Sequence, residues 1–490
     1  MKRNKKKPNP PFRQANNRLR KESYYFIMKR LQVILFLLLS FSSGYLSYAG
    51  GLPADKAVIV TIFSLSILGA LFFWELRHGF MFVGSALYLL IGAVTPEEFV
   101  RFASLDVILF LVSMMIVIGM MKDVGLFEWF MMRLLCIKKL TGRKLFLILM
   151  LTSALFSSLM GEVASTMVMV MTIISICDFL EVDPLPMVIC SVLATNIGSA
   201  STVLGNPVGV LIAARSGLSF EDFLIHALPN STINLAIAAA VLMLIYRHYI
   251  RDINLRLLAM SDNQGFIKLI SIPTDLKSTV SMVIFAVTII LIGLHKRLEL
   301  LIGLEENTLL IMFPILSAGV VLLYRYDKAR FYIENEIEWP SILFFMFLFA
   351  QAGVIQASGA ADLLAQAIVD GSGHQLSHLV GFVLFVGGLL SSILDNVVTV
   401  ATFIPLVQEL EALEAANKNL WWALLFGACY GGNITMIGST ANIVALGLLE
   451  KRCNIKVVFA QWFKIGALIG VLSLVVSYLV MTSLGYMSPQ

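Results

Sequence analysis

The seven residues "SSLMGEV" at positions 157–163 return in altered form as "SSILDNV" at positions 391–397. The first copy lies inside the apolar run 145–176, in which Glu162 is the only charged residue. A lone carboxylate beside a glycine and several hydroxyls is unusual in such a run, because a charge at bilayer depth costs at least ~2.5–3.5 kcal/mol. The two motifs therefore raise the question of what the acidic residue of each copy does.

The similarity between the two copies extends outward on both sides. The shift that places Ser157 on Ser391, here called the hairpin alignment, also places "MKDVGLFEW" (121–129) on "IQASGAADL" (355–363). Downstream, "NIGSASTVLGNPVG" (196–209) matches "YGGNITMIGSTAN" (430–442) in the break alignment, which is shorter by one position and places Gly198 on Gly431. A nearly constant spacing over three motifs predicts that the chain is built from two structural repeats.

The composition indicates a membrane protein. The chain has 490 residues, of which 58% are hydrophobic and only 14% are charged, whereas soluble domains carry about 25% charged residues. Runs long enough to cross a bilayer, roughly 20 apolar residues, recur from residue 31 to residue 486. The five cysteines and six histidines show no spacing typical of a disulfide framework or a zinc site. The formal net charge of +5 need not indicate nucleic-acid binding, because basic residues also orient membrane proteins.

We predict an all-α polytopic membrane protein with about eleven transmembrane helices, two re-entrant hairpins and two broken helices in inverted repeats. The segments 145–214 and 377–450 are apolar but interrupted by Gly, Asn, Pro and Thr, and each is predicted to hold a hairpin followed by a broken crossing. The single crossings are predicted near 31–50, 57–75, 80–95, 105–121, 223–246, 277–294, 307–323, 340–357 and 459–485.

This topology separates the basic residues strongly. It places 30 of the 36 Lys and Arg residues on one side of the membrane. The positive-inside rule then predicts a cytoplasmic N-terminus and an external C-terminus in the cell (inner) membrane. The first repeat starts outside and the second starts inside, so the repeats are predicted to be inverted.

The predicted divisions of the chain follow from these spans. Residues 1–30 form a basic, disordered cytoplasmic tail, and residues 31–56 form the first helix and a loop. The segment from Met28 also resembles a signal peptide, which is the alternative to an uncleaved first helix. The first repeat occupies 57–250, a cytoplasmic linker occupies 251–276, and the second, inverted repeat occupies 277–490.

Inverted repeats with discontinuous helices are typical of secondary transporters, whose site lies near the midplane where the breaks meet. We predict that Glu162, at the tip of the first hairpin, converges there with Asp395 and Asn396 of the second. The alternative for the two acids is a structural role as helix N-caps. For the nearby hydroxyls the alternative is ordinary helix packing; these hydroxyls belong to Ser165, Thr166 and Thr399.

Three longer stretches resemble the ion transporter superfamily: "SSILDNVVTVATFIPLV", "LWWALLFGACYGGNITMIGSTANIVALGLLEK" and "ATNIGSASTVLGNPVGVLI". The nearest branches are the arsenite-pump, melanosomal P protein and D-type sodium/proton antiporter group, and the citrate and divalent-anion symporters are more distant. The resemblance covers roughly residues 57–486. It implies an elevator-type carrier, commonly a homodimer. One departure is that many relatives carry Asp-Asn in both hairpins, whereas the first hairpin here has Gly161-Glu162.

The resemblance also implies which positions hold ions. In the second hairpin these are Asp395, Asn396 and Thr399, and because this hairpin is closer to the family pattern, Asp395 is expected to be the more indispensable acid. In the two broken helices the implicated residues are Asn196, Gly198, Thr202, Gly205, Asn206 and Pro207, then Gly432, Asn433, Thr435, Gly438 and Asn442.

Three substrate classes remain open: sodium against protons, proton-coupled efflux of arsenite or a similar oxyacid, and sodium-coupled uptake of citrate or a dicarboxylate. The hairpin and break motifs contain no basic residue, which favours the first. The partners expected are thus a small inorganic ion, oxyanion or dicarboxylate and the lipid bilayer, with no nucleic acid. No cofactor is expected beyond a sodium ion or proton as the coupling ion, with sodium bound at the same residues. The chain has no GxxxxGK[ST] motif and no soluble catalytic constellation, so neither an ATP-driven pump nor an enzyme is predicted.

Overall fold

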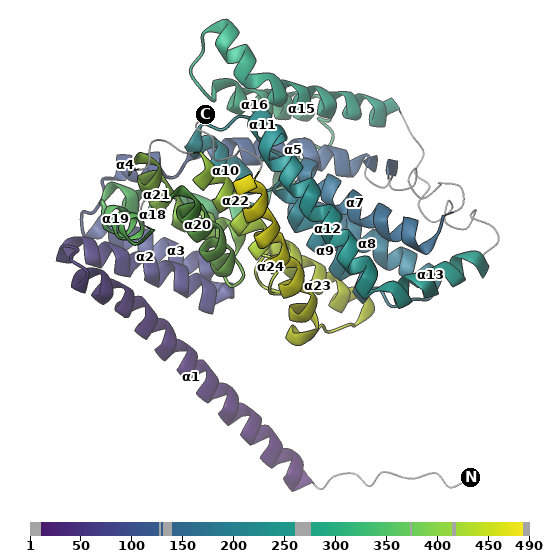
Figure 1. Cartoon of the computed structure of the whole chain (residues 1–490), viewed down its shortest axis with the longest axis horizontal. Coiled ribbons are helices and arrows are strands. Elements are labelled where there is room, and N and C mark those ends of the chain that lie inside the picture. The colour runs from purple at the N-terminus through teal and green to yellow at the C-terminus, as the bar shows by residue number, and fades with distance from the viewer. Residues whose placement is uncertain are drawn as a thin grey trace.

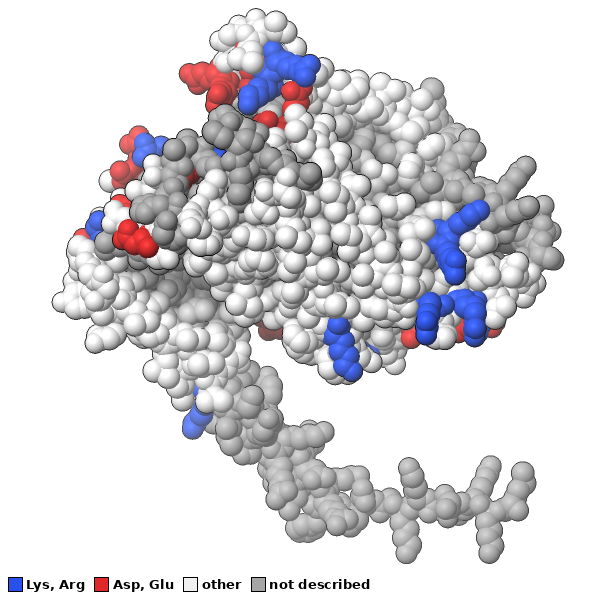
Figure 2. Space-filling view, viewed as in Figure 1, with Lys and Arg blue, Asp and Glu red and all other residues white. Residues whose placement is uncertain are grey.

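The computed structural model describes residues 11–126, 129–130, 140–259, 276–372, 375–413 and 418–483. Within these residues the secondary structure is helical and contains no strand. Ten of the described helices are long and apolar enough to cross a membrane. In Figure 2 the charged side chains gather at the edges of the molecule, and a broad belt of uncharged surface separates them. The chain is therefore an all-α polytopic membrane protein, as the composition predicts.

The helices follow the predicted order in both halves. The first half contains α2 (Ala54–Phe72), α3 (Arg77–Leu90), α4 (Pro96–Phe102), α5 (Leu105–Asp123), α7 (Gly142–Met160), α8 (Glu162–Leu180), α9 (Leu185–Ser199), α10 (Pro207–Ser216), α11 (Phe220–Asp222), α12 (Leu228–Ile245) and α13 (Arg247–Ala259). The second contains α15 (Leu276–Ile302), α16 (Thr308–Tyr324), α17 (Ala329–Phe331), α18 (Trp339–Ala357), α19 (Ala360–Ser372), α20 (Leu376–Ser391), α21 (Asn396–Leu413), α22 (Asn419–Gly431), α23 (Thr440–Cys453) and α24 (Phe459–Ser483). Short 3-10 or π turns are η1 (Trp74–Leu76), η2 (Val203–Gly205), η3 (Phe223–Ala227) and η4 (Tyr332–Glu336).

The first helix corrects one expectation. Residues 11–30, predicted as part of a disordered tail, belong to α1 (Pro11–Ala49), while residues 1–10 lie outside the described part of the chain. The segment 11–30 contains no glycine, and proline is favoured at the first position of a helix. The C-terminal part of α1 packs against α2, and its N-terminal part projects away from the bundle (Figure 1).

Each predicted hairpin is present as two adjacent helices. In the first, α7 ends at Met160 and α8 begins at Glu162, so that Gly161 alone makes the turn with a φ of 86°. This left-handed region favours glycine. In the second, α20 and α21 are joined by residues 392–395. The re-entrant path of both hairpins through the bilayer stays a prediction.

Each predicted broken helix is interrupted where glycines interrupt the sequence, and the first break also contains a proline. The first break separates α9 from α10, and Asn206 caps α10 by accepting a hydrogen bond from the amide of Gly209 (2.8 Å). Pro207 follows at the first helical position, where its missing amide hydrogen costs nothing. The second break separates α22 from α23, and Ser439 caps α23. The break alignment found in the sequence places Asn206 on Ser439, so the two caps correspond.

The helix packing repeats along the chain in the same way. A Cβ placed on Gly119 of α5 would lie 2.6 Å from the Glu336 side chain, and one on Gly353 of α18 would lie 2.6 Å from Phe102. The hairpin alignment places Gly119 on Gly353 and Phe102 on Glu336. At the level of whole helices, α5 packs against α16 and α18 packs against α3. The helix order and the packing of the two halves thus agree with the predicted repeats, while the division into repeats and their inversion across the membrane stay predictions.

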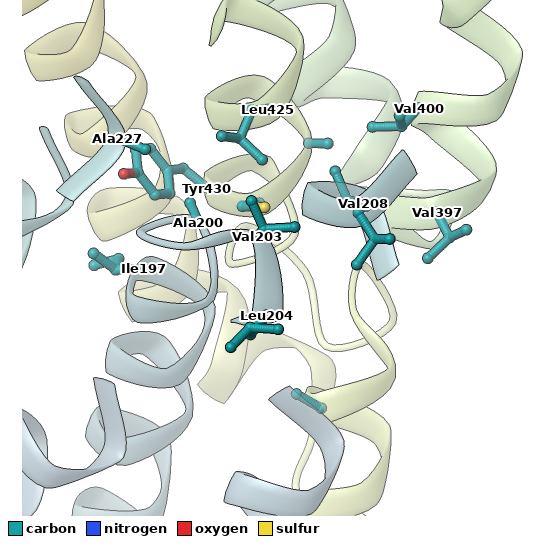
Figure 3. Packing of buried hydrophobic residues seen from close by; sticks show 14 of the residues in the cluster. Ile197, Ala200, Val203, Leu204, Val208, Ala227, Val397, Val400, Leu425 and Tyr430 are labelled. Atoms are coloured by element: carbon teal, nitrogen blue, oxygen red, sulfur yellow. The ribbon is translucent and has the colours of Figure 1, made fainter. Parts of the chain in front are cut away.

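The buried core surrounds the helix breaks. Figure 3 shows Ile197, Ala200 and Val203 near the first break, with Tyr430 of α22 close by. Val208 of α10 lies beside Val397 of α21, and these two helices are in contact. Helices α7 and α20 pack against α9 and α22 respectively. This apolar packing holds the irregular backbone of the breaks next to the two hairpins.

Candidate functional site

The two hairpin tips meet through Glu162 and Asn396. The Asn396 amide nitrogen lies 3.4 Å from Glu162 Oε2, and the hydroxyl of Ser439 lies 3.5 Å from Glu162 Oε1. Both contacts are long for hydrogen bonds to a carboxylate. The Glu162 side chain is only 4% exposed, and no Lys or Arg nitrogen of the described residues lies within 4 Å of it. Glu162 is therefore a buried carboxylate whose acceptor capacity is largely unused.

The orientation of the Asn396 amide decides whether its nitrogen or its oxygen faces Glu162. When the amide is turned over, its nitrogen donates to the carbonyl of Gly438 (2.9 Å), the hydroxyl of Ser391 (2.9 Å) and the carbonyl of Ala428 (3.0 Å). Amide orientation is assigned from such hydrogen bonds, and this one satisfies the nitrogen fully. The Asn396 oxygen then faces Glu162 Oε2. Two acceptors in contact need a proton or a cation between them.

Asp395 is placed differently, because helix N-termini surround its carboxylate. Its Oδ1 accepts the amide of Val397 (3.0 Å), and its Oδ2 accepts both the amide (3.2 Å) and the hydroxyl (2.6 Å) of Thr440. Asp395 thus caps α21 and also ties it to the start of α23. The capping role considered for the two acids is realised by Asp395, whereas Glu162 makes no capping bond.

A cluster of side-chain amides is linked to Glu162 through Ser439. Asn196 donates to Asn433 Oδ1 (2.8 Å) and to Asn442 Oδ1 (2.9 Å), and it accepts from the hydroxyl of Ser439 (3.1 Å). Asn442 in turn donates to the carbonyls of Gly432 (2.8 Å) and Thr435 (2.9 Å) in the second break. This network joins the two broken helices and holds Ser439 toward Glu162.

One threonine in each break forms a hydrogen bond to the backbone of the hairpin in the same repeat. Thr202 donates to the carbonyl of Ser158, and Thr435 donates to the carbonyl of Ser392. The break alignment pairs the donor Thr202 with Thr435. The hairpin alignment pairs the acceptor Ser158 with Ser392. Equivalent hydrogen bonds therefore occur at equivalent positions of the two halves. Thr202 and Thr435 therefore act as fixed links in the site.

The predicted glycines permit close backbone packing. A Cβ on Gly198 would collide with the backbone of Ala154 in α7, and one on Gly205 would collide with Ser199. A Cβ on Gly432 would lie 2.5 Å from the side-chain amide of Asn396, and one on Gly438 would lie 2.8 Å from the carbonyl of Gly432. Substituting any of these glycines would force the hairpins and breaks apart.

Four predicted polar residues lie outside the bonded cluster around Glu162. Ser165 donates to the carbonyl of Ser153 within its own hairpin (3.2 Å). Asn206 donates to Ser199 and to the thiol of Cys429. The buried hydroxyls of Thr166 and Thr399 have no hydrogen-bond partner among the described residues. These two threonines also correspond to each other when the repeats are aligned as in the breaks.

Sequence reasoning missed Ser439 and Thr440. Both lie at the start of α23, where Ser439 reaches Glu162 and Thr440 binds Asp395. The break alignment pairs Ser439 with Asn206, a residue that was predicted. That pairing is the signal that points to Ser439, while no sequence pattern points to Thr440.

A cavity of about 130 Å³ opens beside the hairpin tips and is lined by both acids. Its lining also includes Glu336, Glu338 and Lys122, so four carboxylates and one ammonium group share this space. No group of three or more His, Cys, Asp or Glu side chains in the described residues could hold a metal ion by itself. Carbonyl, hydroxyl and amide oxygens of the breaks, together with Glu162, form a set of hard oxygen donors that suits a sodium ion.

A second, smaller cavity occupies the corresponding place in the other repeat. It measures about 20 Å³, and its lining includes Phe349 and Gln356 of α18 and Ala401 of α21. In the hairpin alignment these positions correspond to Met115, Lys122 and Met167, which line the larger cavity. The same interface is therefore open in the first repeat and nearly closed in the second.

Comparison with known proteins gives consistent results. The sequence profile described as "Citrate transporter" matches residues 69–427 and, in a second match, 333–490. An uncharacterized transporter of Mycobacterium bovis is 29% identical over 374 residues, covering 75% of this chain and 83% of that protein. The 46 kDa membrane protein of Mycobacterium leprae is 30% identical over 385 residues, covering 75% and 84%. The P protein of Homo sapiens is 24% identical over 437 residues, covering 75% of this chain and 52% of that protein.

Proposed function

The chain belongs to the citrate transporter family of membrane proteins, and from this premise we propose that it is a secondary active carrier that exchanges sodium for protons at Glu162. The single observation that supports this most is the buried Glu162 carboxylate, which has two long contacts and no basic partner among the described residues. A buried charge needs compensation. A bound sodium ion and a bound proton both provide it, and they cannot occupy the same carboxylate oxygens together.

The charge of the cavity supports a cation as the substrate. Its lining has four carboxylates and a single ammonium group, and that group, on Lys122, lies 2.6 Å from Glu336. An anionic substrate would enter a space of excess negative charge with no free cation among its lining residues. A proton or sodium ion is attracted into the same space.

The alternative is sodium-coupled uptake of citrate or a dicarboxylate, which the description of the matching family profile favours. In that case sodium ions at the hairpin tips would supply the positive potential for the substrate carboxylates. Proton-coupled efflux of arsenite would use Glu162 as the proton carrier in the same way. The elevator-type motion, the homodimer, the inner-membrane location and the cytoplasmic N-terminus belong to this proposal.

The test uses the purified protein in liposomes with an imposed pH gradient reported by an internal dye. We expect sodium, added outside, to collapse the gradient, and citrate and arsenite without sodium to leave it unchanged. If citrate collapses the gradient only when sodium is present, the uptake alternative is correct. If arsenite alone collapses it, the carrier exports oxyacids.

A further inference from the structure

Three glutamates occupy alternate positions on the segment that leads into the cavity of about 130 Å³ beside the hairpin tips. Glu334 is exposed and lies 2.6 Å from Arg330. Glu336, further in, lies 2.6 Å from Lys122. Glu338 is half-buried and lines the cavity together with Glu162 and Asp395. Glu334 and Glu336 therefore have basic partners, and Glu336 and Glu338 both line the cavity.

Glu338 has no ion-pair partner of its own. No Lys or Arg nitrogen in the described part of the chain lies within 4 Å of its carboxylate, although its two neighbours in the series are paired. Its hydrogen-bond contact is with the hydroxyl of Ser341, at 3.3 Å. Although Glu338 precedes the first residue of α18, its side chain makes no capping bond to the helix backbone. Helix capping therefore does not explain this side chain.

The charged groups that face Glu338 come from several elements. Lys122 of α5 and Arg77 at the start of α3 act on it electrostatically, and Glu162 and Asp395 share its cavity. The Arg77 guanidinium is held 4.1 Å from the ring centre of Trp74. Burial raises the pKa of Glu338, and Ser341, Lys122 and Arg77 oppose this in part. The carboxyl group thus takes up a proton at a higher pH than an exposed glutamate.

The other repeat has no acid at this position. In the hairpin alignment Glu338 corresponds to Ser104, whose hydroxyl accepts a hydrogen bond from Arg215. Likewise the position of Lys122 corresponds to Gln356, and that of Glu336 corresponds to Phe102. The lining of the open cavity is therefore acidic at this point, whereas the corresponding place in the first repeat, beside Ser104, carries the cation Arg215. The two cavities therefore occupy corresponding places but differ in the charge of their lining residues.

We propose that Glu338 is the entry carboxylate of the cation path, the first acid without an ion-pair partner that sodium ions and protons meet between the side predicted to be cytoplasmic and Glu162. This proposal rests on the proposed sodium/proton exchange and adds a residue that determines affinity on one side of the membrane only. A negative charge in the lining of a cavity raises the local concentration of cations. Removing it lowers that concentration without altering Glu162.

The experiment measures sodium-driven proton flux in vesicles of known orientation, with sodium added on either side and over a pH series. For Glu338→Gln we expect the apparent sodium affinity to weaken by about threefold to tenfold on the side of the open cavity. On the opposite side it should be unchanged, and the maximal rate with saturating sodium should be retained. Glu338→Asp should restore most of the affinity. Glu334→Gln, which removes an equal charge outside the cavity, is the matched control and should resemble wild type.

Three outcomes would overturn the inference. An equal change on both sides, or a fall in maximal rate alone, would make Glu338 a structural residue of α18. An affinity loss of the same size in Glu334→Gln would attribute the effect to general surface charge. Failure of the proposed function is distinguishable, because then wild type itself shows no sodium-driven proton flux from either side.

Discussion

The two hairpin tips use similar residues for different purposes. In the second tip, Asp395 accepts three hydrogen bonds of 2.6 to 3.2 Å from Val397 and Thr440. In the first tip, Glu162 has two contacts of 3.4 and 3.5 Å. A carboxylate bound by backbone amides at two helix N-termini is stabilised where it lies. One with unused acceptor capacity is available to a proton or a cation. We infer that Asp395 anchors the site and Glu162 carries the exchange.

The repeat alignment explains why the acids differ. In the hairpin alignment Gly161 is aligned with Asp395, and Glu162 is aligned with Asn396. The acid has therefore moved by one position between the repeats. As a result the first tip has a glycine in the left-handed turn, and its acid starts α8 and points to the other hairpin. A displacement by a single position is enough to turn a capping acid into an unpaired one.

The largest effect is expected from Glu162→Gln. Glutamine keeps the size and the long contacts of Glu162 but carries no charge and cannot exchange a proton. Sodium-driven proton flux in liposomes should fall to background while the protein still folds and inserts. The control is Glu181→Gln at the other end of α8, where the side chain is 86% exposed. Wild-type flux in Glu162→Gln would assign the exchange to another acid and remove the contrast between the tips.

Asp395→Asn should have a smaller effect on flux and a clear effect on stability. Asparagine retains one acceptor oxygen but not the charge that Val397 and Thr440 share. We expect a loss of about 1–3 kcal/mol, because hydrogen bonds to charged groups are the stronger ones. Thermal unfolding in detergent measures this loss, and Thr440→Val is the matched variant that removes the partner. Complete loss of flux with unchanged stability would reverse the roles of the two acids, as the family resemblance suggests.

The smallest effect concerns the two cavities. Single cysteines at Met167 and Ala401 occupy corresponding places in the cavities of about 130 and 20 Å³. In a background without the native cysteines, a small thiol reagent should react at position 401 at least about tenfold more slowly, because local opening must come first. Sodium should change the two rates in opposite directions if the interfaces open alternately. Equal rates under all conditions would mean that the difference between the cavities has no role in transport.

Much of the fold follows from the sequence, because its causes are local. Gly161, Pro207 and the interrupted apolar runs predict the hairpins and breaks, and the repeat spacing predicts their order. The placement of the acids does not follow, since it depends on which helix N-terminus reaches which carboxylate. Thr440 binds Asp395 from a different helix, and no pattern in the sequence indicates that contact. The basic composition of residues 11–30 predicts a disordered tail, but this segment contains no glycine and forms the N-terminal part of α1.

The measurement that tests the central claim most directly is proton release on sodium binding, without transport. Purified protein in weakly buffered detergent solution is titrated with sodium at a series of pH values, and released protons are recorded. Because sodium displaces the proton from Glu162, wild type should release protons, and its apparent sodium affinity should weaken as the pH falls. Glu162→Asp should keep this release with a shifted midpoint, and Glu162→Gln should abolish it. Release by Glu162→Gln equal to that of wild type would contradict the account.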